Sequence, residues 1–145
     1  MFLGEFEHSI DEKGRLTIPA KFRPGLAEGM VITRGLDGCL WVFPTEEWAK
    51  VAEKISRLPL TNPDARDFAR LMFSGAAEVA PDRMGRVLVP AYLREYAHMD
   101  TDAVVIGLNW RLEIWNRDLW RERRSRVEAD ADAIGQHMAE LDLGI

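Results

Sequence analysis

The sequence predicts an α+β fold in which two similar β units form a pseudo-twofold core flanked by helices. The main observation is a repeat: residues 11–20 read DEKGRLTIPA, and residues 82–91 read DRMGRVLVPA, 71 positions later. A shared register of this length indicates one duplicated unit. Short stretches of alternating apolar and polar residues beside turn residues indicate that the unit is built from strands. The register continues 72 positions apart for Gly35, Leu36, Leu40 and Trp48, which match Gly107, Leu108, Leu112 and Trp120.

The first copy is assigned to residues 5–50 and the second copy to residues 77–120. Each is predicted to contain a strand, a tight turn, a second strand, a short helix and a hairpin. In the first copy, residues 16–18 alternate as a half-buried strand would. Pro19 cannot donate to a strand ladder but suits a helix start, so the short helix begins there. Pro90 has the same role in the second copy.

The hairpin of each copy is marked by its turn residues. Asp37 and Gly38 form a pair that favours the positive φ angles of a two-residue hairpin turn. Asn109, which also tolerates a positive φ angle, marks the turn of the second hairpin. The flanking strands are expected at residues 30–33, 39–43, 103–106 and 111–115.

Helices are expected after each hairpin. Two helices fill the connecting segment 51–75, the first starting behind Pro44 and the second at Asn62. The C-terminal segment, 121–145, is predicted to be one helix with an apolar seam. The seam packs either on a neighbouring chain or back on its own core, and the sequence favours neither. Its residues are Val127, Ala131, Ile134, Met138 and Leu141.

Bulk properties narrow the class of protein. A chain of 145 residues with 47% apolar residues suits one compact domain. The net charge of −5 argues against a simple nucleic-acid binder, which would be basic. A single cysteine, Cys39, excludes an internal disulfide and suits a reducing compartment. Neither a basic leader nor an apolar run of about 20 residues is present, so we expect a cytoplasmic protein without membrane association.

The motif Asp-x-x-Gly-Arg begins each repeated stretch, and its chemistry favours a rigid turn. The Asp side chain can accept bonds from amides two residues on, and the Gly supplies a positive φ angle. The Arg that follows is then held firmly enough to reach a guanine edge or a phosphate. A simpler interpretation is that Asp11 pairs with Arg15, and Asp82 with Arg86, only to hold the turn. On spacing alone the simpler interpretation is favoured.

The doubled motif followed by a Pro-Ala helix start resembles the swapped-hairpin family of AbrB-type DNA-binding domains. The tandem copies, the Met-Phe-x-Gly-Glu-Phe opening and the trailing helix are similar to a branch of bacterial regulators within it. This resemblance covers nearly the whole chain. It implies a sequence-specific transcriptional regulator acting at the promoter of the division and cell-wall gene cluster. It also implies a nucleoid-associated homo-oligomer, a ring whose subunits bind repeated elements of double-stranded DNA.

In that family the loop with Asp-x-x-x-Arg binds DNA. Transferred to this chain, the resemblance implies Arg15 as the main base reader and Lys13 as a phosphate contact. Arg86 and Arg83 are the candidates in the second copy. The copies differ at this point, because the second has Met84 in place of Lys13 and gains Arg83.

The sequence leaves two other classes of function as alternatives to DNA binding. An enzyme could use His8, Asp11 and Glu12, but successive strand residues point to opposite faces, and no metal-ligand spacing or nucleophile motif is present. We therefore expect no catalytic residue, metal or cofactor. An oligomeric ring or adaptor whose arginine turns bind an acidic protein is the second alternative, and the acidic net charge favours it. The five tryptophans are expected to be mostly core, with Trp110 as the exception.

Overall fold

The computed structural model describes residues 1–142. Within them, no helix is both long enough and apolar enough to cross a membrane. The chain first forms β1 (Phe2–Ser9), β2 (Arg15–Thr17), the 3₁₀ helices η1 (Ala20–Phe22) and η2 (Pro24–Leu26), β3 (Met30–Arg34), β4 (Leu40–Pro44), α1 (Thr45–Ser56) and α2 (Pro63–Gly75). It continues as β5 (Ala77–Val79), β6 (Arg86–Leu88), α3 (Ala91–Tyr96), β7 (Asp102–Asn109), β8 (Leu112–Asn116), α4 (Arg117–Ala129) and α5 (Ala131–Ala139).

The local chemistry predicted from the sequence is present at the turns and caps. Asp37 and Gly38 have φ angles of 67° and 81°, and Asn109 has a φ angle of 68°. The hairpin turns are therefore confirmed. The side chain of Asn62 accepts a hydrogen bond from the Ala65 amide and so caps α2. Both prolines predicted to start a short helix lie one position before it, as the N-cap residues of η1 and α3.

Strands of the two copies are exchanged within one antiparallel sheet of order β1-β7-β8-β4-β3-β5. β1 of the first copy pairs with β7 of the second, and β5 of the second pairs with β3 of the first. β2 and β6 pair with each other as a separate two-stranded ribbon. This exchange confirms the α+β fold with two swapped-hairpin units.

The strand register defines the pseudo-twofold axis. Trp41 lies opposite Glu113 where β4 meets β8, and these residues are 72 positions apart. Leu16 lies opposite Val87 in the ribbon, and these residues are 71 positions apart. Each pair therefore joins a residue to its own counterpart in the other copy, so the axis passes through both pairs.

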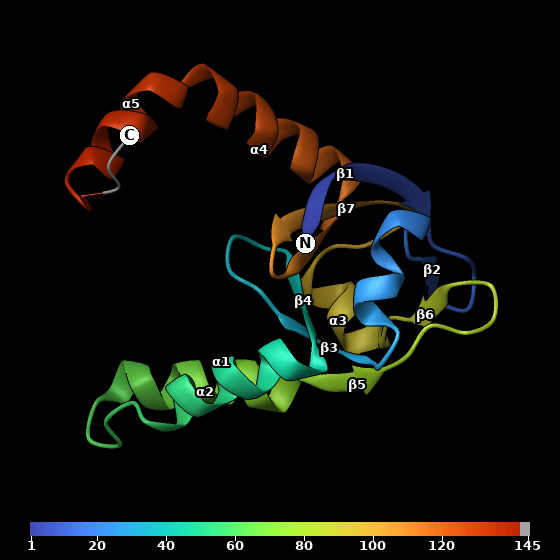
Figure 1. Ribbon diagram of the computed structural model, residues 1–145, viewed down its shortest axis with the longest axis horizontal. Helices are drawn as coiled ribbons and strands as arrows, with labels where there is room; N and C mark the ends of the chain where they lie inside the picture. The colour runs from blue at the N-terminus through green and yellow to red at the C-terminus, as the bar shows by residue number, and fades with distance from the viewer. Residues whose placement is uncertain (143–145) are drawn as a thin grey trace.

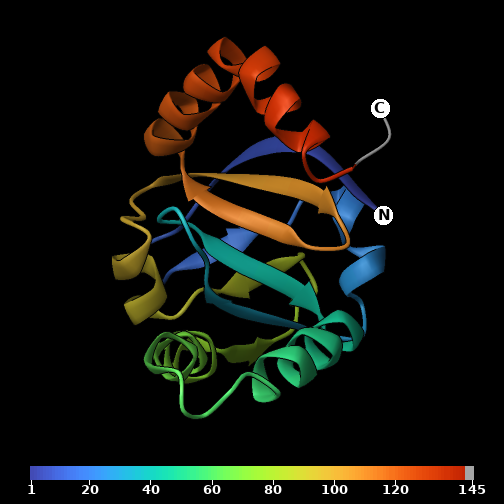
Figure 2. The same cartoon turned by 90° about the vertical axis from the view of Figure 1, so that its left-hand side faces the viewer.

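The main core lies between the six-stranded sheet and a layer made of the ribbon, η1, η2 and α3. Leu16 and Val87 of the ribbon pack there with Phe22 of η1 and Leu93 of α3. The other face of the sheet carries two smaller apolar clusters. One lies under α1 and α2, and the other lies under the start of α4 (Figure 2). Four of the five tryptophans are buried or partly buried, whereas Trp110 is 44% exposed.

The C-terminal segment differs from the single helix that was expected. α4 ends at Ala129 and α5 begins at Ala131, so the chain bends at Asp130 (Figure 2). Aspartate is a weak helix former because its side chain competes for backbone groups, and this favours a break there. The seam is not packed on the core of its own chain: Val127 and Met138 are 45% and 37% exposed. The last residues of the predicted helix, 143–145, lie outside the described residues.

Candidate nucleic-acid interface

The first turn, residues 11–15, is built by the side chain of Asp11. Its Oδ1 accepts hydrogen bonds from the amides of Lys13 at 3.0 Å and Arg15 at 2.9 Å. Gly14 has a φ angle of 86° and donates its amide to the Asp11 carbonyl at 2.9 Å. The predicted turn chemistry is therefore confirmed, and it fixes the point at which Arg15 leaves the turn and enters β2.

The second turn, residues 82–86, repeats this geometry. Oδ1 of Asp82 accepts hydrogen bonds from the amides of Met84 and Arg86, both at 2.9 Å. Gly85 has a φ angle of 75°. In both turns the amide of the arginine, bonded to the carboxylate, lowers the pKa of the aspartate below its ordinary value. The aspartates are therefore held in the charged form that the turns require.

Each arginine also pairs with the aspartate of its own turn. Nε of Arg15 lies 2.7 Å from Oδ2 of Asp11, and Nε of Arg86 lies 2.9 Å from Oδ2 of Asp82. The ion pairs of the simpler interpretation are thus present. A guanidinium has five N–H donors, and within residues 1–142 these pairs engage only Nε. The terminal Nη groups remain for another acceptor, so the ion pair and an outward contact are compatible.

The ribbon brings the two predicted arginines together. Arg15 lies opposite Leu88 and Arg86 lies opposite Thr17, while Leu16 and Val87 between them point into the core. Arg15 and Arg86 therefore share the outer face of the ribbon. Both turns project from the same end of the molecule, opposite the end from which α1, α2, α4 and α5 extend (Figure 1).

Lys13 and Arg83, the other two predicted residues, are exposed within the first and second turns. Met84, which stands where the first turn has Lys13, is 65% exposed. The structure thus brings the four predicted residues onto two neighbouring turns of one ribbon. The two turns nevertheless present different side chains, because the second turn has Met84 at the position equivalent to Lys13.

Two further arginines belong to this surface and were missed from the sequence. Arg94 lies against Gly14 of the first turn, and Arg23 lies against Gly85 of the second turn. The repeat signals their equivalence, since they occupy matching positions 71 residues apart. The repeat does not reveal what these two arginines contact, because each of them packs on the turn of the other copy, which is distant in the sequence.

Local charge at this end differs from the net charge of the chain. The two turns and the arginines packed on them carry more cations than carboxylates, and two of the carboxylates are already paired. Two arginines of α4 pair with carboxylates of β1: Arg121 with Glu7 at 2.7 Å and Arg124 with Glu5 at 2.8 Å. A hydrogen bond from the Trp120 indole lowers the pKa of Glu5, which keeps that carboxylate charged. The two turns and the arginines packed on them therefore carry a local excess of positive charge, which suits contact with a polyanion.

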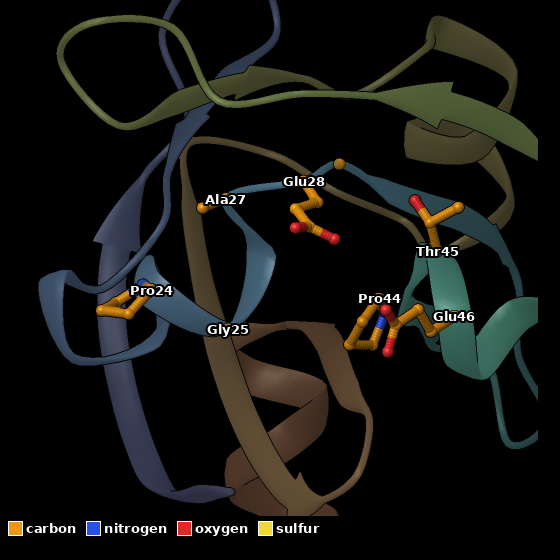
Figure 3. Close-up of a pocket in the computed structure, with 8 residues that line it drawn as sticks. Pro24, Gly25, Ala27, Glu28, Pro44, Thr45 and Glu46 are labelled. Atoms are coloured by element: carbon orange, nitrogen blue, oxygen red, sulfur yellow. The ribbon is translucent and has the colours of Figure 1, made fainter.

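A hollow of about 260 Å³ lies at the start of α1, away from the turns. Glu28 and Glu46 border it together with Pro24 and Pro44 (Figure 3). Carboxylates at its rim repel phosphate, so this hollow does not extend the candidate interface.

His8 and Asp11, two of the residues of the enzyme alternative, have structural places in the fold. His8 lies in β1 opposite Ala103, and Asp11 is used by the first turn. Among residues 1–142, no group of three or more His, Cys, Asp or Glu side chains is placed to hold a metal ion. The arrangement that the fold does create is a pair of rigid, arginine-bearing turns.

A family model and the full-length relatives of this chain indicate the same protein family. A family model described as "MraZ protein, putative antitoxin-like" matches twice, over residues 1–71 and 72–141. The chain is 48% identical over 145 residues to the transcriptional regulator MraZ of Pelotomaculum thermopropionicum, covering all of both chains. It is 49% identical over 141 residues to that of Carboxydothermus hydrogenoformans, covering 97% of this chain and 99% of the relative. For the regulator of Desulforamulus reducens the identity is 47% over 141 residues, with the same coverage. With two matched halves and full-length relatives that carry one name, the chain belongs to the MraZ family.

Proposed function

We propose that the protein is a transcriptional regulator that binds specific sequences of double-stranded DNA through its two turns. The observation that carries the proposal is the ribbon, which sets Arg15 and Arg86 on one face at one end of the molecule. A two-stranded β-ribbon fits the major groove of B-DNA, where arginine recognises guanine through O6 and N7. The curated relatives named as transcriptional regulators support the same function.

The roles of the four turn residues are those that the family resemblance implies, and their placement is compatible with them. Arg15 is the main base reader in this proposal; its Nε is anchored to Asp11, as Nε of Arg86 is to Asp82, so both side chains extend from a fixed point. Lys13 contacts phosphate from the tip of the first turn. Arg86 and Arg83 contribute the corresponding contacts from the second turn. The two DNA-contacting units are residues 5–50 and 77–120.

Assembly completes the proposal. Several copies form a ring, and their turns bind repeated elements at the promoter of the division and cell-wall gene cluster. Because binding events tethered to one ring multiply through effective concentration, each subunit needs only weak affinity. The exposed seam on α4 and α5 supports contact with a neighbouring chain. A regulator of this kind acts on the chromosome, so the proposal includes association with the nucleoid in the cytoplasm.

The test is the variant Arg15→Ala, measured against DNA enriched from a random library by the wild-type protein. We expect a loss of affinity of about 100-fold and loss of preference for the enriched sequence, with the assembly unchanged in size-exclusion chromatography. Arg57→Ala is the matched control, because Arg57, the C-cap residue of α1, is exposed and pairs with Glu53.

Salt and sequence dependence separate DNA binding from an adaptor function. Affinity for DNA should fall steeply as salt is added, because phosphate contacts release counterions. Enrichment of spaced repeats would support the ring. If the selection enriched no sequence, an adaptor that binds acidic proteins would be the better account. If Arg15→Ala bound the enriched DNA as tightly as the wild type, the assignment of Arg15 as the main base reader would be wrong.

A further inference from the structure

We propose that Arg94 and Arg23 are positioning residues, each of which holds the DNA-binding turn of the opposite copy in its working geometry. Arg94 of the second copy holds the first turn, and Arg23 of the first copy holds the second turn. The inference deepens the proposed function and rests on it where DNA affinity is the readout. Its structural part can be measured without DNA.

The contact between each arginine and the opposite glycine is close. A Cβ atom on Gly14 would lie 2.7 Å from Cζ and 2.8 Å from Nε of Arg94. A Cβ atom on Gly85 would collide with both Nε and Cζ of Arg23. The guanidinium groups therefore occupy the space that any larger residue would fill, directly beside the peptide that precedes Arg15 or Arg86.

Backbone hydrogen bonds close a circuit around each contact. Nε of Arg23 donates to the carbonyl of Ile18 at 2.9 Å, and the amide of Ile18 donates to the carbonyl of Gly85 at 2.8 Å. One residue of the first copy thus holds both the arginine and the opposite turn. We call the trio Arg23, Ile18 and Gly85 the second clamp, because it holds the second turn.

The first clamp has the same construction. Nε of Arg94 donates to the carbonyl of Val89 at 3.0 Å, and the amide of Val89 donates to the carbonyl of Gly14 at 2.9 Å. Each member lies 71 positions from its counterpart in the other clamp. The geometry therefore occurs twice in one chain with different neighbours, which argues against an incidental contact.

The chemistry of the clamp requires arginine. Its planar guanidinium can lie flat beside a glycine while Nε, within the plane, donates to the carbonyl. Lysine keeps the charge but has neither the plane nor an Nε–H at that position. Replacement of Arg94 or Arg23 by lysine therefore separates positioning from simple attraction to phosphate.

Hydrogen–deuterium exchange of the full-length assembly tests the clamps directly. Arg94→Lys should speed exchange of the amides in residues 11–15 by about tenfold while residues 82–86 keep their rate. Arg23→Lys should do the reverse. Peptides from β3 and β4 report whether the core is intact in both variants. Equal effects on the two turns, or no effect on either, would overturn the proposal.

DNA binding provides the second test. Each lysine variant should lose affinity by about tenfold with an unchanged slope of log affinity against log salt. A phosphate contact predicts a different pair of results: lysine would retain the affinity, and the alanine variants would reduce the slope by about 1. That outcome would assign these arginines to direct contact rather than positioning.

Combination with Arg15→Ala reveals which turn each arginine serves. Arg94→Lys should add little to the loss caused by Arg15→Ala, because both act on the first turn. Arg23→Lys should multiply that loss, because it acts on the second turn. The reverse pattern would contradict the assignment. If the wild type bound no DNA selectively, the proposed function would fail, and the exchange data would still decide the clamps.

Discussion

Gly85 and Gly38 have similar positive φ angles, 75° and 81°, but very different surroundings. A Cβ atom on Gly85 would collide with Arg23, whereas a Cβ atom on Gly38 would meet nothing within 4 Å. Replacing each glycine by alanine therefore distinguishes the cost of backbone strain alone from the cost of strain plus a steric collision. Gly38 is required only by the positive φ angle of the hairpin turn. Gly85 is required by the positive φ angle of its turn and by the close contact with the arginine of the opposite copy.

We expect Gly38→Ala to lower the free energy of unfolding by about 1 kcal/mol, the strain of alanine at a positive φ angle. Gly85→Ala should lower it by about 2–3 kcal/mol, because Arg23 must also move and give up its bond to Ile18. Urea unfolding at one fixed protein concentration measures both. Equal losses would mean that the contact with Arg23 contributes nothing.

The aspartates of the turns, Asp11 and Asp82, should make the free energy of unfolding depend on pH in the acid range. Their pKa values are lowered in the folded state, so their contribution to stability is complete above the ordinary value of about 3.9. It is lost as the pH falls through the lower folded value. Asp11→Asn and Asp82→Asn should therefore be less stable than wild type by a constant amount between pH 7 and pH 5.

This difference in stability should begin to shrink below about pH 3.9, the ordinary pKa, because the unfolded wild-type chain then takes up protons before the folded turns do. Urea midpoints at pH 7, 5 and 3 provide the measurement. A difference that changes between pH 7 and pH 5 would show that some other group titrates with the turns.

At the level of elements, strands and hairpin turns followed from residues close in the sequence. Asp37 and Asn109 adopt the positive φ angles that their types allow, and α2 begins at its predicted cap. The C-terminal helix was predicted incorrectly as one piece, because its apolar spacing runs through Asp130 without interruption. Periodicity describes the face of a helix and does not detect a bend between two helices that share that face.

The exposed seam predicts how the C-terminal helices are used. Val127, Ile134 and Met138 are 45%, 39% and 37% exposed although they recur on a helical spacing. We expect the triple replacement of these residues by serine to shift the assembly to smaller species in size-exclusion chromatography with light scattering. Thermal unfolding of the core should change little. Apolar side chains that pack on no core of their own chain add little to its stability.

Leu60→Ser serves as the control for the seam, because Leu60 is 83% exposed and lies in the connection between α1 and α2. It should leave the assembly unchanged. An unaltered assembly in the triple variant would move the intersubunit contact away from α4 and α5.

At the scale of the whole molecule, the two copies meet around Glu113 on the pseudo-twofold axis. Its carboxylate accepts hydrogen bonds from the indoles of Trp41 at 3.0 Å and Trp115 at 2.9 Å. Arg111 donates a third bond at 3.1 Å. Trp41 belongs to the first copy and the others to the second, so one carboxylate joins the two copies at the centre of the sheet.

Glu113→Ala should lower the free energy of unfolding by about 3 kcal/mol, because it leaves several partly buried donors without an acceptor. Glu113→Gln keeps one acceptor oxygen and should lose only about 1 kcal/mol. Urea unfolding at matched protein concentration compares them. If both variants lost the same free energy of unfolding, the negative charge of Glu113, and not its hydrogen bonds, would be what stabilises the fold.

The duplication, the turn chemistry and the candidate arginines Arg15 and Arg86 could all be read from the amino-acid order. They depend on conformational preferences of neighbouring residues and on a repeat that is visible along the chain. The exchange of strands, the placement of Arg94 and Arg23 on the opposite turns and the junction at Glu113 emerged only in three dimensions. Each joins residues that lie between 45 and 107 positions apart in the sequence, and no local pattern encodes which distant partner a side chain will meet.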